Sequence, residues 1–582
     1  MIVRETEVLV IGSGGAGLRA AIAAREAGAK TLVISKTLAG KAGCTVMAEG
    51  GYNAAIRTKE PKDSPQSHYE DTVKSGAGLS NTELVRLLVG MAPKRLYDME
   101  GYGALFSRGR GGLIAQRQFG AQSYQRTCYA ADRTGHEIVM TLIQEVRKQR
   151  IDVLNYLFAV DLIVNDHKVY GVLAYDVKHP GFVLIKSKAT VLATGGGGKC
   201  WLVSSNSYHG TGDGYGLATR AGATMCDLEQ VQFHPTMMVY PDSAKGILVT
   251  EAVRGEGGLL YNVTPKLREA LEENGRLRKG GGQPRSIDPE DFGAERFMNR
   301  YDPQRMELSA RDIVARSITQ ELSEGRGTER GGVLLSVVHL DGALVRERLS
   351  TMYKQFKDFC DVDITREPME VAPGQHHVMG GLVIDKDCRT SLKSLYACGE
   401  VVGGIHGGNR LGGNALAEGQ VFGAIAGEIA AKDNKNVKDK FDPEPLAEEI
   451  ENRLSSKFGN GKGDSRPCNI KQKLQPVMTA KVGVIRDEDG LKEALNEIGK
   501  LEAELKQVSV KNAHLPFNQD TVDYFEIQNM LEFSKLVIKS ALMRQESRGA
   551  HYRSDFPKRD DENFGKNIFV EGERLWIEKR WS

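Results

Sequence analysis

The chain has 582 residues, too many for one hydrophobic core, so two to four packed units are expected. Its 78 lysine and arginine residues nearly balance its 76 aspartate and glutamate residues, which leaves a formal net charge of +2. A charge so close to zero provides no electrostatic attraction to nucleic acid or to anionic lipid, so neither is expected as a direct partner.

The cysteine pattern argues against a metal site in this chain. Its 8 cysteines are scattered without a CxxC pair, so no zinc or iron–sulfur site is expected, and the thiols are expected to be reduced. The first residues lead directly into a predicted strand, and no apolar run approaches the roughly 18 residues that span a bilayer. We therefore expect a cytoplasmic protein that would associate with a membrane only through partner subunits.

The first element of the chain predicts a dinucleotide site. Residues 7–11 form an apolar run typical of a buried strand, residues 18–27 an alanine-rich helix and residues 31–34 a second strand, which is a βαβ unit. The turn after the first strand has GxGxxG spacing and contains Gly12, Gly14, Gly15, Ala16 and Gly17. Such glycines let the backbone approach a ligand closely, and the helix N-terminus offers N–H groups to a pyrophosphate.

Two later segments repeat the pattern of an apolar strand that ends at glycine. Residues 189–193 lead to Thr194 and Gly195, and residues 395–398 lead to Gly399 and Glu400. Three separate pieces of chain are therefore expected to build one nucleotide-binding domain.

The end of the second strand carries Ser35 and Lys36, where an NAD site usually has an acidic residue that binds ribose. Asp213 and Glu400 supply carboxylates near other strand ends. The pattern therefore favours FAD over NAD, with Ser35, Lys36, Asp213 and Glu400 among its contacts.

The predicted fold class is α/β, a Rossmann-like FAD-binding domain with an inserted α+β capping domain, a C-terminal helical domain and a tail. The expected divisions are 1–233 and 372–432 (discontinuous FAD-binding domain), 234–371 (capping or substrate domain), 433–545 (helical domain) and 546–582 (tail segment). Within the capping domain, the polar stretch 272–291 is expected to be an exposed loop, and the tail is expected to lie on another part of the molecule.

Seven further segments are each short, but taken together they are specific to one protein family. They are residues 45–51 (TVMAEGG), 232–236 (QFHPT), 250–258 (TEAVRGEGG), 307–312 (ELSARD), 376–381 (HHVMGG), 406–414 (HGGNRLGGN) and 546–553 (ESRGAHYR). Through them the chain resembles the flavoprotein subunits of succinate dehydrogenases and fumarate reductases from end to end. Residues 43–45 and 126–129 are most similar to the archaeal, methanogen-type branch, which includes fumarate reductases that use thiol cofactors as reductant.

The resemblance implies that FAD lies between the nucleotide-binding and capping domains, with a C4 dicarboxylate over its isoalloxazine ring. It implies further FAD contacts from Gly43, Cys44, Thr45, Gly50, Gly51, Asn414 and Leu416. The best-known members have a histidine at the position of Cys44 that is bonded covalently to the flavin, so FAD is expected to be non-covalent here. A cysteinyl thioether is the alternative, because a thiolate is a good nucleophile.

The resemblance also implies a substrate site. His234, His376 and Arg410 would hold the substrate carboxylates, Thr250 would add a hydroxyl and Phe119 would pack against the substrate. A guanidinium can bind a carboxylate bidentately, and donors that polarise one carboxylate stabilise developing enolate charge, so the first three also count as catalytic. A lone histidine is more often structural, and the shared context of His234 and His376 is what favours a functional role.

Arg311 corresponds to the family's proton donor, with Glu251 and Arg254 as a relay toward solvent. Arginine is a poor acid in water, so this role requires a strongly basic carbanion and neighbouring cations. The alternative is that Arg311 only pairs with Glu251. His377 stands where the family more often has tyrosine, and no role is predicted for it.

The predicted function is FAD-dependent interconversion of fumarate and succinate, by hydride transfer between flavin N5 and the dicarboxylate. A flavin without the covalent bond is expected to have a lower reduction potential, which favours the reduction of fumarate. At position 49 the dehydrogenases tend to have glutamine, so Glu49 is more typical of the fumarate reductases and favours the same direction. Because the chain has no cysteine motif for an iron–sulfur cluster, electrons are expected to come from an iron–sulfur partner subunit. A membrane anchor or a thiol-oxidising module is a candidate for a further partner.

Two alternatives stay open from the sequence. One is L-aspartate oxidase, a relative with the same fold, against which stand the long helical region and residues 559–564. The other is a non-catalytic flavin electron carrier in a larger complex, which would make the combination of His234, Arg311, His376 and Arg410 accidental.

Overall fold

The computed structural model describes residues 1–435, 437, 441–458, 465–579 and 581. Parts of the predicted helical domain and tail, at 436, 438–440, 459–464, 580 and 582, lie outside the described residues. The described strands are β1 (Ile2–Ile11), β2 (Thr31–Ser35), β3 (Tyr52–Asn53), β4 (Gln116–Arg117), β5 (Thr127–Cys128), β6 (Asp152–Asn155), β7 (Leu157–Asn165), β8 (Lys168–Asp176), β9 (Gly181–Leu192), β10 (Met225–Cys226), β11 (Val231–Met238), β12 (Leu259–Tyr261), β13 (Val333–Ser336), β14 (Met369–Val378), β15 (Gly381–Leu382), β16 (Leu395–Ala397), β17 (Asn567–Glu571) and β18 (Arg574–Glu578).

The described helices are α1 (Gly15–Glu26), α2 (Cys44–Met47), α3 (Pro65–Ser75), α4 (Thr82–Gly101), α5 (Thr134–Lys148), α6 (Asp213–Ala221), α7 (Glu251–Gly255), α8 (Pro265–Lys279), α9 (Met298–Tyr301), α10 (Arg311–Ser323), α11 (Gly342–Arg348), α12 (Ser350–Cys360), α13 (Asn414–Asp433), α14 (Glu444–Ser455), α15 (Pro467–Lys481), α16 (Glu488–Gln507), α17 (Gln519–Met543) and α18 (Asp561–Phe564). None of these described helices combines the length and the apolar character that a membrane span requires.

The main sheet has the strand order β6-β2-β1-β9-β8-β7, and β16 pairs with the carboxyl end of β9. β1 runs parallel to β2 and β9, and β16 runs parallel to β9. Leu192 pairs with both Ile11 and Ala397, so the three strands end at the same edge of the sheet. The prediction that the three strand-to-glycine segments combine is therefore confirmed.

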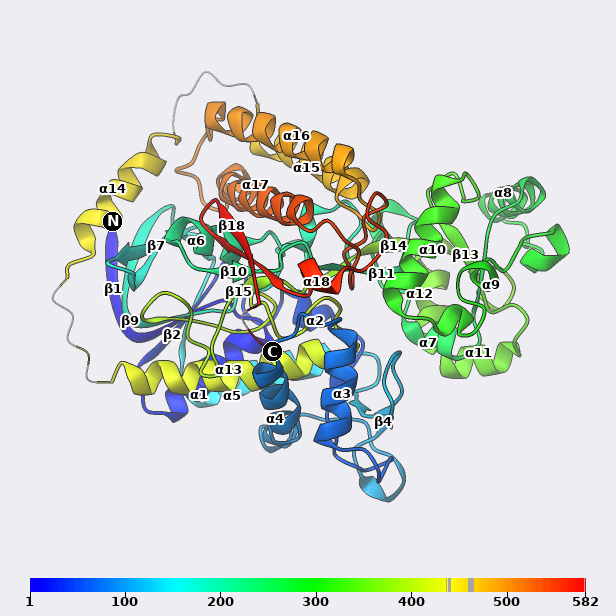
Figure 1. Cartoon of the computed structure of the whole chain (residues 1–582), viewed down its shortest axis with the longest axis horizontal. Helices are drawn as coiled ribbons and strands as arrows, with labels where there is room; N and C mark the ends of the chain where they lie inside the picture. The colour runs from blue at the N-terminus through cyan, green and yellow to red at the C-terminus, as the bar shows by residue number, and fades with distance from the viewer. Residues whose placement is uncertain (436, 438–440, 459–464, 580, 582) are drawn as a thin grey trace.

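Helix α13 lies along α1 on one face of this sheet (Figure 1). A Cβ atom added at Gly427 would lie 1.9 Å from the Ala20 carbonyl oxygen, and one added at Gly423 would lie 2.6 Å from that of Ala16. Such a close backbone approach requires glycine, because any side chain would force the two helices apart. This contact joins the late segment of the chain to the N-terminal segment in one core.

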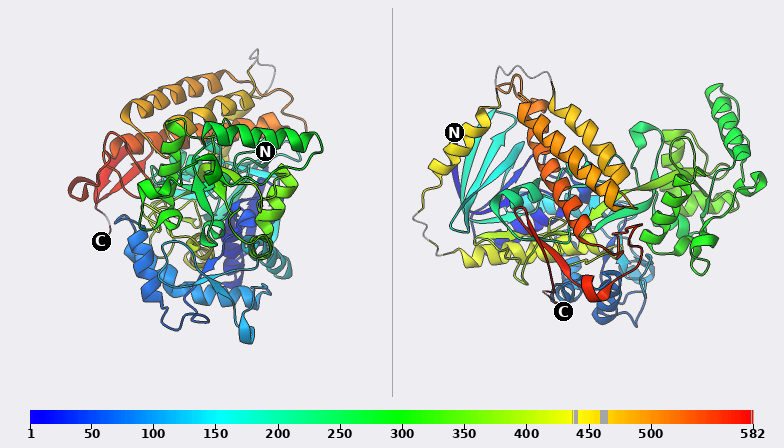
Figure 2. Two further views of the ribbon diagram at one scale, coloured as in Figure 1. Left: turned by 90° about the vertical axis from the view of Figure 1, so that its right-hand side faces the viewer. Right: turned by 45° about the horizontal axis from the view of Figure 1, so that its top comes forward.

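A second, antiparallel sheet has the order β11-β14-β13-β12 and packs with α7 and α9 to α12 around its own core, which includes Val253, Leu335 and Phe356. Helix α8 packs in a smaller cluster that contains Leu267 and Leu334. These elements form the lobe on the right of Figure 1, which also stands apart in Figure 2; we call it the capping lobe. The chain enters it through β11 and leaves it through β14, and these two strands pair with each other. The predicted limits of the capping domain, 234 and 371, fall within these two strands.

The expected exposed loop at 272–291 is wrong in its first part, because residues 265–279 form helix α8. Thr264 caps this helix by accepting from the Leu267 N–H, and Pro265 occupies its first position. Cap and proline are a helix start signal that outweighs the polar composition, and the glycines from Gly280 onward follow the helix end.

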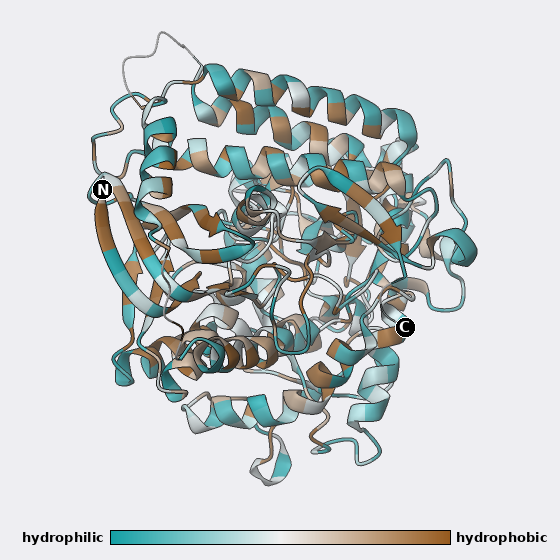
Figure 3. Ribbon diagram, turned by 60° about the vertical axis from the view of Figure 1, so that its left-hand side comes forward, coloured by the Kyte–Doolittle hydropathy of each residue, from teal (hydrophilic) through white to brown (hydrophobic). Residues whose placement is uncertain are grey.

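Helices α15 to α17 lie at the top of Figure 1 and α14 lies at its left, beside the N-terminus; α17 packs on α6. In Figure 3, the two outermost helices at the top, α15 and α16, alternate hydrophilic and hydrophobic ribbon, as expected of helices with one buried face. The tail forms a hairpin, in which β17 pairs with β18 and with β10. The prediction that the tail lies on another part of the molecule is thus confirmed for its described residues.

Candidate active site

A cavity of about 550 Å³ lies where the ends of β1, β9 and β16 meet the capping lobe. Its walls come from the glycine turn, from α2, from the ends of β9 and β16, from the start of α13 and from the lobe residues Thr250, Glu251 and Arg311. Ligands of open parallel sheets bind at this edge, because strand-end loops and helix N-termini converge there.

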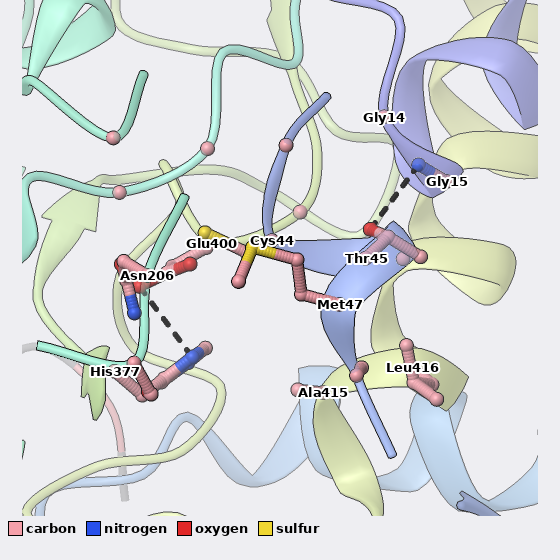
Figure 4. Close-up of a pocket in the computed structure, with 18 of the residues that line it drawn as sticks. Gly14, Gly15, Cys44, Thr45, Met47, Asn206, His377, Glu400, Ala415 and Leu416 are labelled. Atoms are coloured by element: carbon pink, nitrogen blue, oxygen red, sulfur yellow. Dashed lines mark hydrogen bonds and ion pairs between the residues drawn. The ribbon is translucent and has the colours of Figure 1, made fainter. Parts of the chain in front are cut away.

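The glycine turn leaves the backbone open to a ligand. Gly12 has a φ of +114°, and a Cβ atom there would lie 2.2 Å from the Ala193 carbonyl oxygen. Gly14 precedes α1, and a Cβ atom there would meet only Thr45 Oγ1, at 3.8 Å. The Gly15 N–H donates to that hydroxyl at 3.3 Å (Figure 4). The N-terminus of α1 therefore forms bare cavity wall, which suits a pyrophosphate.

Two predicted FAD contacts support the wall without lining it. A Cβ atom at Gly17 would lie 2.1 Å from the Gly12 carbonyl oxygen, so this glycine packs α1 against the turn. The Asn414 amide oxygen accepts from Asn53 Nδ2 at 2.7 Å and lies 2.8 Å from His68 Nε2, which holds the start of α13. The other predicted FAD contacts line the cavity: Gly12, Gly14, Gly15, Ala16, Ser35, Lys36, Gly43, Cys44, Thr45, Gly50, Gly51, Thr194, Gly195, Asp213, Glu400 and Leu416.

The charge of the Lys36 amine is balanced by two carboxylates, one of which comes from helix α17. Its Nζ lies 2.7 Å from Asp213 Oδ2 and 2.8 Å from Glu526 Oε1. Burial alone would lower the pKa of Lys36, but the two carboxylates outweigh it and raise this pKa, so the amine stays charged. Glu526 lies on α17 and was missed by the sequence analysis, because no local pattern links residues so far apart in the chain.

Cys44 begins α2 in the cavity wall, on the side where Glu400 and His377 also lie (Figure 4). Burial, together with the Glu400 carboxylate, raises the pKa of the Cys44 thiol to about 12. Burial also raises the pKa of Glu400 to about 7, although its carboxylate accepts from the Val378 N–H at 3.0 Å. The Cys44 thiol is therefore protonated near neutral pH and is a weak nucleophile.

His234 and His376 face each other at the lobe end of the cavity, with ring centroids 5.5 Å apart. His234 Nδ1 lies 3.0 Å from the Thr236 carbonyl oxygen and 3.3 Å from the Thr236 N–H nitrogen, so either tautomer of the ring has a partner, and His376 Nδ1 lies 2.8 Å from Ser205 Oγ. Burial, followed by nearby arginines, holds the pKa of both rings well below the usual range, so both are neutral. His234 Nε2 is buried and has no hydrogen-bond partner among the described residues.

Arg410 and Arg311 bring two guanidinium groups to the same end. Arg410 is 6% exposed, and its Nη2 donates to Gln232 Oε1 at 3.1 Å. Burial and the Arg311 charge lower the pKa of Arg410 to about 9. Arg311 donates to Glu251 Oε2 from Nε at 3.0 Å and from Nη2 at 2.8 Å. Arg410 Nε and Arg311 Nη1 are buried and have no hydrogen-bond partner within the described ranges.

Of the predicted proton relay from Arg311 through Glu251 and Arg254, only the step between Arg311 and Glu251 is joined by hydrogen bonds. Glu251 accepts from Arg311 and from the Gly120 N–H at 3.1 Å. Burial would raise the pKa of Glu251, but Arg311 and Arg254 outweigh it and lower this pKa. Arg254 is fully buried behind the cavity, and its Nη1 donates to the Glu307 carbonyl oxygen at 2.6 Å. Arg254 therefore acts on Glu251 through its charge.

Thr250 and Phe119 also line this end of the cavity. Thr250 directly precedes α7, and the Phe119 ring lies beside Gly412, whose added Cβ atom would approach it to 3.2 Å. The sequence analysis gave no role to Gln232 or Ser205, which hold Arg410 and His376. Gln232 lies in the matching segment 232–236, which was a usable signal, but Ser205 lies in no motif.

The sequence comparisons agree with this arrangement. Family models for an FAD binding domain and for the fumarate reductase flavoprotein C-term match residues 7–416 and 471–579, respectively. The chain belongs to this flavoprotein family. It is therefore an FAD-dependent oxidoreductase of the fumarate reductase and succinate dehydrogenase type, and both the resemblance and the fold class predicted from the sequence are confirmed.

The flavoprotein has relatives that match it over nearly its whole length. An uncharacterized FAD-dependent oxidoreductase of Methanocaldococcus jannaschii is 48% identical, over 99% of this chain and 98% of its own. A subunit of the fumarate reductase (CoM/CoB) of Methanothermobacter marburgensis is 46% identical, over 95% of each chain. A solved structure of E. coli quinol fumarate reductase matches with a TM-score of 0.89 at 31% identity, over 100% of this chain and 97% of that chain.

The flavoprotein should lose FAD when a side chain fills the bare wall at Gly14. Gly14 has φ −75° and ψ −176°, which valine also adopts, so Gly14→Val leaves the apoprotein intact but projects methyl groups toward the ligand. We expect FAD to bind roughly 10–100-fold more weakly, which corresponds to about 1–3 kcal/mol of overpacking. Quenching of FAD fluorescence measures the dissociation constant.

Gly109→Val is the matched control. Gly109 has a similar backbone conformation, φ −91° and ψ −165°, and it lies outside the cavity wall. FAD binding by Gly14→Val as tight as that by Gly109→Val would contradict an approach of the cofactor to this turn.

Proposed function

We propose that the chain interconverts fumarate and succinate and works mainly as a fumarate reductase. The observation that carries the proposal is a group of buried nitrogens without protein acceptors among the described residues, His234 Nε2, Arg311 Nη1 and Arg410 Nε, at one end of the FAD cavity. His234 Nε2 is a donor in the tautomer in which Nδ1 accepts from the Thr236 N–H. Buried donors are costly unless a partner satisfies them, and a dicarboxylate dianion would satisfy all three. Two guanidiniums beside only one directly paired carboxylate, Glu251, also leave net positive charge for such a dianion.

In this proposal Arg410 and the two histidines hold the substrate carboxylates. A neutral histidine donates one hydrogen bond without adding charge, and the Arg410 guanidinium supplies charge-assisted bonds that strengthen as enolate charge develops. Gln232 and Ser205 fix the orientation of Arg410 and His376. Bound FAD supplies the hydride chemistry.

Arg311 delivers the proton in the reducing direction. Glu251 engages its Nε and Nη2, which leaves Nη1 as the guanidinium nitrogen available to substrate. The two guanidiniums lie close enough that, after burial, the Arg311 charge lowers the pKa of Arg410. Glu251, whose side chain is 15% exposed, then takes up a proton from water and passes it to Arg311, and the Arg254 charge stabilises the Glu251 carboxylate that this step restores.

The reducing direction is inferred from Cys44, which departs from the family pattern, and from Glu49, which is more typical of the fumarate reductases than of the dehydrogenases. Cys44 and Glu49 both favour fumarate reduction, and one relative that matches 95% of the chain is named as part of a CoM/CoB fumarate reductase. Electrons are proposed to arrive through an iron–sulfur partner subunit, with a thiol-oxidising module or a membrane anchor completing the complex.

The function is tested with the FAD-loaded chain and two substrate pairs. With reduced methyl viologen as donor, we expect fumarate-dependent viologen oxidation. With L-aspartate and oxygen, we expect no hydrogen peroxide, because the match of residues 471–579 to the fumarate reductase C-terminal model supports the respiratory type. Peroxide formation from aspartate would favour the oxidase, and loss of both activities with FAD bound would favour an electron carrier.

Replacement of Arg311 should separate chemistry from binding. Arg311→Gln removes the proton donor, so kcat for fumarate should fall by about 10²–10⁴-fold, whereas FAD should remain bound and fumarate should still perturb the flavin spectrum. The control is Arg348→Gln, which removes an arginine that pairs with Glu256 at 2.8 Å on the same lobe but outside the cavity. A kcat of Arg311→Gln near that of the control would exclude Arg311 as the acid.

The bound flavin should be non-covalent. Because burial keeps the Cys44 thiol protonated, it is a poor nucleophile toward the flavin. Acid precipitation of the holoprotein should release essentially all yellow flavin into the supernatant, and Cys44→Ser should behave identically. Flavin retained on a peptide that contains Cys44 would show a thioether instead.

A further inference from the structure

The backbone that carries Arg410 is held between two distant segments of the chain. We call residues 407–410 the arginine loop and residues 548–551 the tail turn. The Gly408 N–H donates to the Gly76 carbonyl oxygen at 2.8 Å, and the Gly408 carbonyl oxygen accepts from the Ala550 N–H at 2.8 Å. Both backbone groups of Gly408 are thus satisfied from outside the arginine loop, one of them by the tail turn.

The tail turn touches the arginine loop backbone to backbone. Gly549 has a φ of +57°, and a Cβ atom there would lie 2.3 Å from the Gly408 carbonyl oxygen and 2.8 Å from Gly408 Cα. Real Cβ atoms do not approach backbone atoms so closely, so a side chain at position 549 must displace the arginine loop or the tail turn.

The tail turn is itself anchored by a buried ionic network. The Arg548 side chain is fully buried, its Nη1 donates to the Ala77 carbonyl oxygen at 2.8 Å, and its Nε donates to Glu546 Oε1 at 2.7 Å. Glu546 also pairs with Arg544 at 3.2 Å, and Arg544 pairs with Glu229 at 2.6 Å. Breaking such a buried network costs folding free energy, so the network holds the tail turn in a fixed position against the arginine loop.

The other end of the arginine loop is tied to Gln232. Its Nε2 donates to the Arg410 carbonyl oxygen at 2.9 Å and to Asn409 Oδ1 at 2.7 Å, and its Oε1 accepts from Arg410 Nη2 at 3.1 Å. Gln232 therefore orients the guanidinium, and the tail turn sets how far the backbone of the arginine loop can move away from the cavity. None of residues 548–551 lines the cavity.

We propose that the tail turn is a positioning element for the dicarboxylate site, in which Arg548, Gly549 and Ala550 hold the arginine loop so that Arg410 reaches a substrate carboxylate. This inference rests on the proposed function, because it treats Arg410 as a dicarboxylate ligand. A shift of about 1 Å in a substrate-binding group costs up to about 10²-fold in catalysis, so a contact outside the cavity can control the site.

The test is Gly549→Ala in the full-length holoprotein, with Gly572→Ala as matched control. Gly572 lies in the β17–β18 hairpin with a φ of +56°, nearly that of Gly549, but a Cβ atom there meets nothing within 4 Å. Both variants therefore carry the same backbone strain, and only Gly549→Ala pushes on Gly408. We expect at least about 10-fold weaker fumarate and oxaloacetate binding, read from the flavin difference spectrum, and a raised KM. FAD affinity should equal that of the control, and Tm should fall because of the close contact.

The remaining outcomes are decisive. Equal dicarboxylate affinity in the two variants overturns the inference and leaves the proposed function intact. A wild-type holoprotein that binds neither fumarate nor oxaloacetate overturns the proposed function, and the inference with it. If Gly549→Ala does not fold, Arg548→Lys decides: it keeps the charge beside Glu546 but lacks the second arm that reaches Ala77, so weaker dicarboxylate binding at unchanged FAD affinity supports the inference and unchanged binding overturns it.

Discussion

Strand β9 imposes the constraint on which the rest of the site depends. Its last residues pair on one side with β1 and on the other with β16, in parallel. Since all three strands point the same way, their terminal loops must emerge at one edge, and Gly12, Gly195 and Gly399 line a common cavity there. The adjacency of three segments far apart in the chain turns a short glycine motif into a site long enough for a dinucleotide.

The same edge becomes a reaction site because the capping lobe covers it. The lobe is an insertion whose entry and exit strands, β11 and β14, pair with each other, so His234 and His376 face one another across neighbouring strands. Its helices α7 and α10 begin at the cavity with Glu251 and Arg311. The sheet thus provides the edge at which the cofactor-binding loops meet, and the lobe brings the side chains of Glu251 and Arg311 to it.

Electrostatics distinguishes the two ends of the cavity. At the Lys36 end the cation is neutralised by Asp213 and Glu526. At the His234 end Arg311 pairs with Glu251, whereas the Arg410 guanidinium donates to the neutral Gln232 amide. Burial is the main cause of the lowered pKa of Arg410, and repulsion from the Arg311 charge adds to it. A ligand with phosphates near one end and carboxylates at the other complements this charge distribution.

The sequence by itself determined the βαβ unit, the FAD preference, the insertion and a set of cavity-lining residues, because these depend on local periodicity, turn chemistry and motifs with fixed spacing. It failed at residues 272–279, where the cap at Thr264 extends a helix into a polar stretch. Only the tertiary structure decided which distant groups hold the functional side chains: Glu526 on Lys36, Ser205 on His376, Gln232 on Arg410 and the tail turn on the arginine loop. These contacts join residues with no shared local pattern, and their geometry follows from the packing of whole elements.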